Sequence, residues 1–120
     1  MLSACLKSTD PSDPQHQAFT LAPGELATTK DSAIRIQFEG VLSDSRCPID
    51  VVCIQAGDAV VKIHVQSRDS QEQSYELHTS DLQPVAHDGA KITLVQLMPY
   101  PVSSRTIAPD EYRATLLVTE

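Results

Sequence analysis

The sequence predicts an all-β fold, an antiparallel β-sandwich of about seven short strands, with a small β-barrel as the second choice. Three observations lead to this class. Apolar and polar residues alternate with a period of two along most of the chain, helical spacing fails in every apolar run, and prolines cut the segments between the runs. At 120 residues the chain is long enough for one core. Little or no helix is expected.

The expected strands follow this alternation in chain order. They cover residues 19–21, 26–28, 34–38, 61–65, 75–77, 92–97 and 112–118. In the sixth strand the inward phase slips from Leu94 to Val95 and Leu97, which predicts a β-bulge. A short helical turn is expected after Pro109, where a proline and two acids suit a helix N-terminus, and another could begin at Ser80–Asp81.

Composition and charge exclude several classes of protein. Hydrophobic residues make up 41% of the chain, which is too apolar for disorder, and no run of about eighteen apolar residues could span a bilayer. The net charge is −7, from 16 acidic and nine basic residues. Because nucleic-acid binding relies on clustered Lys and Arg, this balance argues against nucleic acid and against an electrostatic grip on anionic lipid.

The sequence around the first cysteine predicts where the protein is located in the cell. Residues 2–5 read Leu-Ser-Ala-Cys and resemble a bacterial lipobox, whose cysteine receives a lipid after signal-peptide cleavage. We therefore expect a precursor extending upstream of Met1 and a protein held in the cell envelope by a lipid on Cys5, facing the periplasm or the exterior. The alternative is that Cys5 is a free thiol and the match is chance. The expected organisation is a signal-peptide remnant with the lipobox (1–5), a polar, proline-containing flexible tether (6–16) and a single β-sandwich domain (17–120).

The other two cysteines, Cys47 and Cys53, are predicted to form a disulfide that pins a long connection between strands. Closing this seven-residue loop should stabilise the fold by about 2 kcal/mol. A redox pair is disfavoured, because such pairs usually have two intervening residues and sit at a helix start. Arg46 is expected to pair locally with Asp44 or Asp50.

No metal, cofactor or catalytic residue is assigned from the sequence. The potential ligands show no short zinc spacing and no calcium-loop pattern, and they are His16, His64, His78, His87, Asp44, Asp50 and Asp58. His64 and His78 fall on expected solvent faces. No Gly-x-Ser-x-Gly elbow is present, and no serine stands in a context that positions a histidine and an aspartate.

The central segment carries a resemblance. It reads Asp-Ser-Arg-Cys-Pro from Asp44, reaches the next cysteine, Cys53, after four further residues, and continues with Ala-Gly-Asp-Ala to Ala59. This pattern, with the later Ile-Ala-Pro-Asp-Glu-Tyr-Arg-Ala-Thr-Leu from Ile107, resembles a group of small secreted or lipoprotein domains of bacteria to which no activity is assigned. The resemblance implies a shared fold. An aromatic residue often stands in that group where this chain has Gln55.

The segment 98–102, Met-Pro-Tyr-Pro-Val, is the strongest candidate contact site. Pro99 and Pro101 should hold an extended loop from which Tyr100 projects as an anchor for a partner, although Tyr100 could instead cover the sandwich edge. The leading hypothesis is a non-enzymatic binding or interaction module that contacts an envelope protein or ligand through a sandwich edge or loop 98–107. One alternative is a metal-handling protein or enzyme whose site assembles from scattered histidines with Asp44, Asp50 or Asp58. Another is a structural part of an envelope assembly.

Overall fold

A computed structural model of the chain describes residues 16–29, 33–68 and 71–119. Within these ranges the protein contains eight strands and one short 3₁₀ helix. The strands are β1 (His16–Leu21), β2 (Leu26–Thr28), β3 (Ile34–Asp44), β4 (Ala59–Ser67), β5 (Gln73–His78), β6 (Val85–His87), β7 (Ala90–Met98) and β8 (Arg113–Thr119). β1 begins one residue before the expected domain start at Gln17, so His16 belongs to a strand and not to the tether. Cys5, the lipobox and the rest of the expected tether lie outside the described residues.

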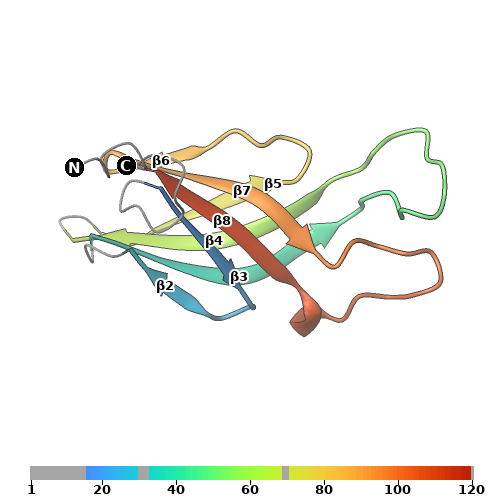
Figure 1. Cartoon of the computed structure of the whole chain (residues 1–120), viewed down its shortest axis with the longest axis horizontal. Coiled ribbons are helices and arrows are strands. Elements are labelled where there is room, and N and C mark those ends of the chain that lie inside the picture. The colour runs from blue at the N-terminus through green and yellow to red at the C-terminus, as the bar shows by residue number, and fades with distance from the viewer. Residues whose placement is uncertain (1–15, 30–32, 69–70, 120) are drawn as a thin grey trace, which may run out of the picture.

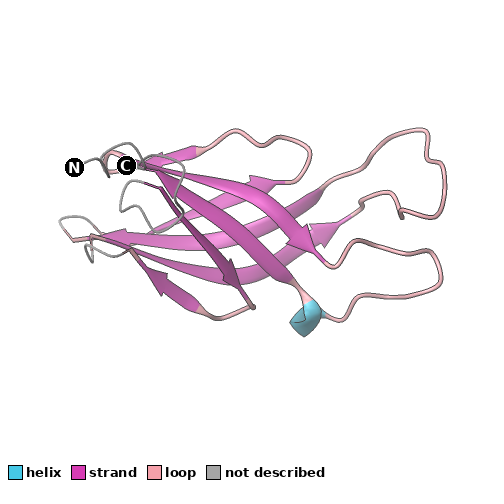
Figure 2. Ribbon diagram, viewed as in Figure 1, coloured by secondary structure: helices cyan, strands magenta, loops and turns pink. Residues whose placement is uncertain are grey.

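The strands form two four-stranded antiparallel sheets that pack face to face (Figures 1 and 2). One sheet has the order β1-β8-β7-β6 and the other the order β2-β3-β4-β5. Every strand pairs only within its own sheet, so the structure is an open sandwich. The predicted sandwich is confirmed, and the barrel alternative is wrong.

The core lies between the two sheets and follows the predicted alternation. Ile36 and Phe38 of β3 and Ile63 of β4 face residues of β7 and β8, while the polar residues between them face outward. The side chains that point between the sheets are apolar because burying a polar group without a hydrogen-bond partner costs free energy. The largest fully buried side chains are Phe38, Ile36, Ile63, Ile92, Leu94, Leu97, Leu116, Val61, Val65 and Val118.

The predicted bulge in β7 is confirmed, with one correction. Leu94 pairs with Leu116 and Gln96 with Thr115, so Val95 is the extra residue of the bulged strand. Val95 was expected to face the core, but it is half exposed, and the core side resumes at Leu97. An inserted residue in a strand is left unpaired and turns away from the ladder, which explains its exposure.

Two short elements test the finer expectations. The helical turn after Pro109 is present as the 3₁₀ helix η2 (Pro109–Glu111), where Glu111 caps the backbone N–H of Ala108. The possible turn of helix at Ser80–Asp81 is not formed. There the chain makes a tight turn closed by a bridge between His78 and Asp81.

The two ends of the sandwich differ. The start of β1 and the end of β8 lie side by side, with His16 paired to Thr119. The connections between β3 and β4 and between β7 and β8 extend from the opposite end (Figure 1). Among the described residues no helix is long and apolar enough to cross a membrane.

Candidate functional site

The connection from β3 to β4 is a stiffened loop. Cys47 and Cys53 form the predicted disulfide. The chain on either side of it continues as a short ladder, in which the N–H of Ser45 donates to Asp58 over 2.7 Å and that of Cys47 donates to Ala56 over 2.9 Å. The loop is therefore held by two backbone hydrogen bonds at its base and by the disulfide nearer its tip.

Gly57 makes this close approach possible. Its φ is +76°, and a Cβ at this position would lie 1.9 Å from the carbonyl oxygen of Ser45. Glycine suits this position because it adopts a left-handed backbone readily and has no Cβ to collide with the backbone of Ser45.

The connection from β7 to β8 is bonded to the disulfide loop. The N–H of Ile49 donates to the carbonyl of Pro101 over 2.9 Å. Asp50 accepts two hydrogen bonds from Ser103, at 2.9 Å from the backbone N–H and 2.5 Å from the hydroxyl. These bonds lower the pKa of Asp50. Because the two connections brace each other, we treat residues 45–58 and 98–108 as one surface, the loop end.

Arg46 fastens the loop end to the sandwich. Its guanidinium donates two hydrogen bonds of 2.8 Å to the carboxylate of Asp44, confirming the predicted local pair. It also donates to the carbonyls of Leu97 at 2.8 Å and Pro99 at 3.1 Å, and so ties β3 of one sheet to the end of β7 in the other. The arginine and aspartate side chains are only 10% and 13% exposed.

Tyr112 completes this buried cluster from the start of β8. Its hydroxyl donates to Asp44 over 2.8 Å. The hydrogen bonds from Arg46 hold the pKa of Asp44 below its usual value, against the opposing effect of burial. Burial, together with the bond to Asp44, raises the pKa of Tyr112 to about 12, so the phenol remains a neutral donor.

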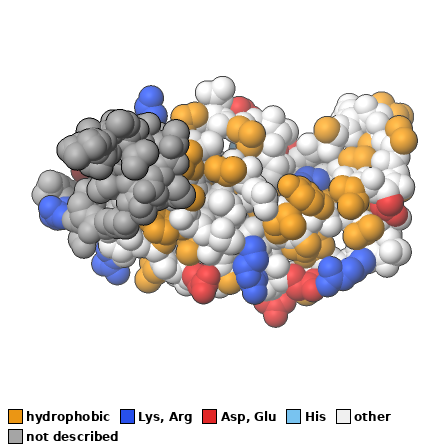
Figure 3. Space-filling view, viewed as in Figure 1, with side chains coloured by type: hydrophobic (Ala, Val, Ile, Leu, Met, Phe, Trp, Pro, Cys, Tyr) orange, Lys and Arg blue, Asp and Glu red, His pale blue; other side chains and the backbone are white. Residues whose placement is uncertain are grey.

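The tip of the loop end is apolar and open to solvent. Val52 and Ile54 are 101% and 104% exposed, as exposed as side chains in an extended chain, and Ile49 is 70% exposed. With Val51 and Tyr100, at 42% and 48%, they form what we call the apolar patch. In the space-filling view several hydrophobic side chains are exposed at the end of the molecule that carries the long loops (Figure 3). Apolar groups held out together in this way are typical of a contact surface.

A narrow groove adjoins the patch beside β7. It encloses about 150 Å³ and is lined by Arg46, Thr79, Leu82, Leu94, Val95, Gln96, Leu97 and Tyr100. Tyr100 is half exposed and lies at the rim of the groove. The structure brings the predicted contact residue next to an apolar depression, and the proline-flanked loop of Pro99 and Pro101 next to the disulfide loop.

The three aspartates suspected as ligands have separate partners. Asp44 contacts Arg46, Asp50 contacts Ser103, and Asp58 lies 2.6 Å from Nδ1 of His78. In the described part of the chain no three His, Cys, Asp or Glu side chains converge in a group that could hold a metal ion. The structure thus joins only one of the suspected aspartates to a histidine.

The Asp58–His78 pair joins the start of β4 to the end of β5. Partial burial raises the pKa of Asp58, but hydrogen bonds from His78 and from the backbone N–H of Ser80 outweigh it and lower the pKa to about 2. The hydrogen bond to Asp58 raises the pKa of His78. Each group therefore favours the charged form of the other.

A second polar chain crosses the solvent face of the β3-β4-β5 sheet, where His64 was expected. Ser74 Oγ lies 2.9 Å from Nδ1 of His64, whose Nε2 contacts the carboxylate of Glu39. A serine, a histidine and a carboxylate in a row resemble an activated nucleophile. These side chains, however, stand on the solvent face of β3, β4 and β5, and none of them lines a described cavity. The arrangement matches the polar cross-strand pairs that usually stabilise a sheet by a few tenths of a kcal/mol.

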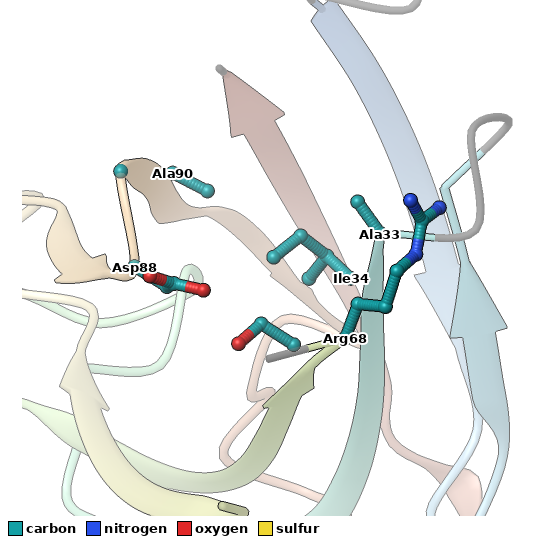
Figure 4. A pocket seen from close by; sticks show the side chains of 7 residues that line it. Ala33, Ile34, Arg68, Asp88 and Ala90 are labelled. Atoms are coloured by element: carbon teal, nitrogen blue, oxygen red, sulfur yellow. The ribbon is translucent and has the colours of Figure 1, made fainter. Parts of the chain in front are cut away.

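Another cavity lies at the other end of the sandwich. It encloses about 350 Å³ between the start of β3, the end of β4 and the β6–β7 turn. Figure 4 shows Asp88 on one wall and Arg68 on the other, with the guanidinium pointing away from the carboxylate. The remaining lining side chains are small or aliphatic except for Ser67, so no set of polar groups converges there.

No protein-family model, no curated protein and no solved structure matches this chain. The resemblance to bacterial secreted or lipoprotein domains therefore stays a prediction, and function has to be argued from the chemistry of the loop end.

Proposed function

We propose that this protein is a non-enzymatic binding module of the cell envelope, anchored through a lipid on Cys5, that contacts its partner with the loop end. The observation that carries the proposal is the full exposure of Val52 and Ile54 at the tip of a cross-linked loop. An aliphatic side chain that stays exposed to water does not stabilise the fold by hydrophobic burial. If a partner buried it fully, each such side chain would contribute about 1.5–3 kcal/mol to the free energy of binding.

The rigidity of the loop end supports a binding role. Binding is weakened when side chains and loops must be ordered at the interface. Here the disulfide, the Asp50–Ser103 hydrogen bonds and the four hydrogen bonds of Arg46 order the loops before any partner arrives. These cross-links reduce the loop ordering that binding through the patch would require.

The position of the patch suits an anchored protein. The disulfide favours an oxidising compartment such as the cell envelope. The described chain enters the sandwich at His16, at the end opposite to the loop end (Figure 1). The described chain therefore begins at the end of the sandwich away from the apolar patch, which is compatible with an upstream anchor.

Partner capture from envelope extracts tests the contact surface. The double variant Val52→Ser/Ile54→Ser is compared with wild type and with Leu26→Ser, whose leucine is 56% exposed on β2, away from the loop end. We expect the double variant, and Tyr100→Ala, to lose a partner that wild type and Leu26→Ser retain, as identified by mass spectrometry. Equal recovery of every partner by all variants would contradict the proposal.

The anchor is tested separately. Expressed with its natural upstream sequence, wild type should fractionate with membranes and carry the mass of a lipid on Cys5, whereas Cys5→Ser should not. A membrane-bound Cys5→Ser protein, or an unmodified Cys5 in wild type, would remove the lipid from the proposal and leave the contact surface untouched.

A further inference from the structure

The tip of the disulfide loop exposes backbone as well as side chains. Nearer its base the backbone is paired, since the N–H of Ile49 donates to Pro101 over 2.9 Å and that of Val51 donates to Pro48 over 3.3 Å. Along residues 52–55, in contrast, no backbone N–H or carbonyl is hydrogen-bonded to any other residue that the structure describes. These donors and acceptors are therefore open to a partner.

The side chains of the same segment need a partner that encloses them. Val52 and Ile54 are fully exposed, so a flat surface would cover only part of each side chain. Burying them requires a pocket around each one, and pairing the backbone between them requires donors and acceptors along the same cleft. Proteins that bind peptides combine these two features, with main-chain hydrogen bonds for affinity and side-chain pockets for specificity.

The tip differs from an ordinary peptide because it is tied at several points. The disulfide closes residues 47–53, and the Asp50–Ser103 and Ile49–Pro101 hydrogen bonds hold the loop to its neighbour. A segment ordered in advance loses less conformational entropy on binding. The disulfide would also keep the two ends joined if any peptide bond between Cys47 and Cys53 were cut. Contact loops that change little on binding are typical of protein inhibitors of peptidases.

We propose that the tip, residues 49–55, occupies the active-site cleft of a peptidase that accepts aliphatic side chains, and so inhibits it. Val52 and Ile54 fill two side-chain pockets of the cleft, and the open backbone of residues 52–55 pairs with its walls. Inhibition needs no covalent step, because the occupied cleft excludes the substrate. This inference rests on the proposed binding function and names the class of its partner.

A lipid surface fits the tip less well. The unpaired backbone groups of residues 52–55 would find no hydrogen-bond partners in hydrocarbon, which makes their insertion costly. Asp50 is exposed between two of the aliphatic residues, and residues 47–58 contain two aspartates and neither Lys nor Arg. The tip therefore carries no basic group to attract anionic headgroups. A peptide-binding cleft supplies the missing backbone partners.

Inhibition assays with the purified protein test the inference. The probes are elastase, papain, thermolysin and the total peptidase activity of an envelope extract from the natural host, each with fluorogenic peptides rich in Val, Leu and Ala. We expect inhibition of at least one of these activities, and a higher substrate concentration should relieve it. Val52→Ser and Ile54→Ser should each raise the inhibition constant about tenfold or more, while Leu26→Ser should leave it unchanged. Because both side chains are fully exposed, these variants should fold as wild type does.

The disulfide gives a second readout. Wild type should stay intact during incubation with the inhibited peptidase, as measured by mass spectrometry under reducing conditions. Cys47→Ser/Cys53→Ser should inhibit more weakly and be cut within residues 49–55, because its tip is no longer closed. Rapid cleavage of wild type at the tip would make the loop a substrate and overturn the inference.

Three further results would overturn it. These are no inhibition of any probe up to about 0.1 mM protein, inhibition that Val52→Ser and Ile54→Ser leave unchanged, or inhibition that substrate does not relieve. Binding to neutral or anionic vesicles that the two variants lose, with no peptidase inhibited, would replace the cleft by a membrane. The tests separate the two proposals, because loss of a native partner other than a peptidase on changing Val52 and Ile54 would uphold the binding function and refute the inhibitor.

Discussion

Removing the carboxylate of Asp44, the last residue of β3, should be the most destabilising of the changes considered at the base of the loop end. Asp44→Ala takes two of the four hydrogen bonds from the Arg46 guanidinium, and it removes the acceptor of the Tyr112 hydroxyl. Because the Arg46 side chain is only 10% exposed, its charge is left buried without a counter-charge. Breaking a buried pair in this way costs about 3–5 kcal/mol of the free energy of unfolding.

Urea denaturation followed by circular dichroism measures this loss. Tyr112→Phe, which deletes one hydrogen bond to a charged acceptor, should cost less, about 1.5–3 kcal/mol. The double variant Asp44→Ala/Arg46→Met should be more stable than Asp44→Ala alone, because no buried charge remains. Its recovery should be partial, since the carbonyls of Leu97 and Pro99 lose their donor. A loss below about 1 kcal/mol for Asp44→Ala, or a double variant less stable than the single one, would refute this reasoning.

Three further predictions concern the disulfide loop and the neighbouring Asp58–His78 pair. Cys47→Ser/Cys53→Ser should lower the free energy of unfolding by about 2 kcal/mol and keep the β-type circular dichroism spectrum; an unchanged melting temperature would count against it. Gly57→Ala should destabilise the fold by about 1–3 kcal/mol in urea titration, because Cβ meets the facing backbone, whereas Gln55→Ala, at an exposed site, should be neutral. The stability lost in His78→Ala should be largest near about pH 5. It should shrink as pH falls toward the lowered pKa of Asp58 at about 2 and as pH rises through the raised pKa of His78, and a pH-independent loss would contradict the ion pair.

Local patterns in the sequence were enough to predict the sandwich and the disulfide. Alternation along residues 34–38 and 61–65 reports directly which side chains face the core, and Cys47 and Cys53 are close enough in sequence to bond whatever surrounds them. β6 was missed because a strand of only three residues carries too little alternation to be recognised. Val95 was placed on the wrong side because the pattern shows that a bulge exists but not which residue is inserted.

The candidate site was predicted less well, because its contacts join distant parts of the chain. A local pair of Arg46 with Asp44 or Asp50 was predicted, and Asp44 forms it. The bonds of Arg46 to the carbonyls of Leu97 and Pro99 were not predicted, because they depend on how the two sheets stack. The alignment of Ser74 with His64 likewise depends on strand register. The apolar patch had a visible signal, four aliphatic residues within 49–54 in a segment of turn formers and charges, but only the fold shows that these side chains point into solvent.

The central claim is that the loop end is the contact surface of this protein. Site-specific photo-cross-linking in cells of the natural host tests it most directly, with the photoreactive residue placed at Val52, at Tyr100, or at Leu26 on β2 as a control. The account predicts a discrete cross-linked protein at positions 52 and 100 and none at position 26. Absence of any adduct at positions 52 and 100, or the same adducts at position 26, would contradict it.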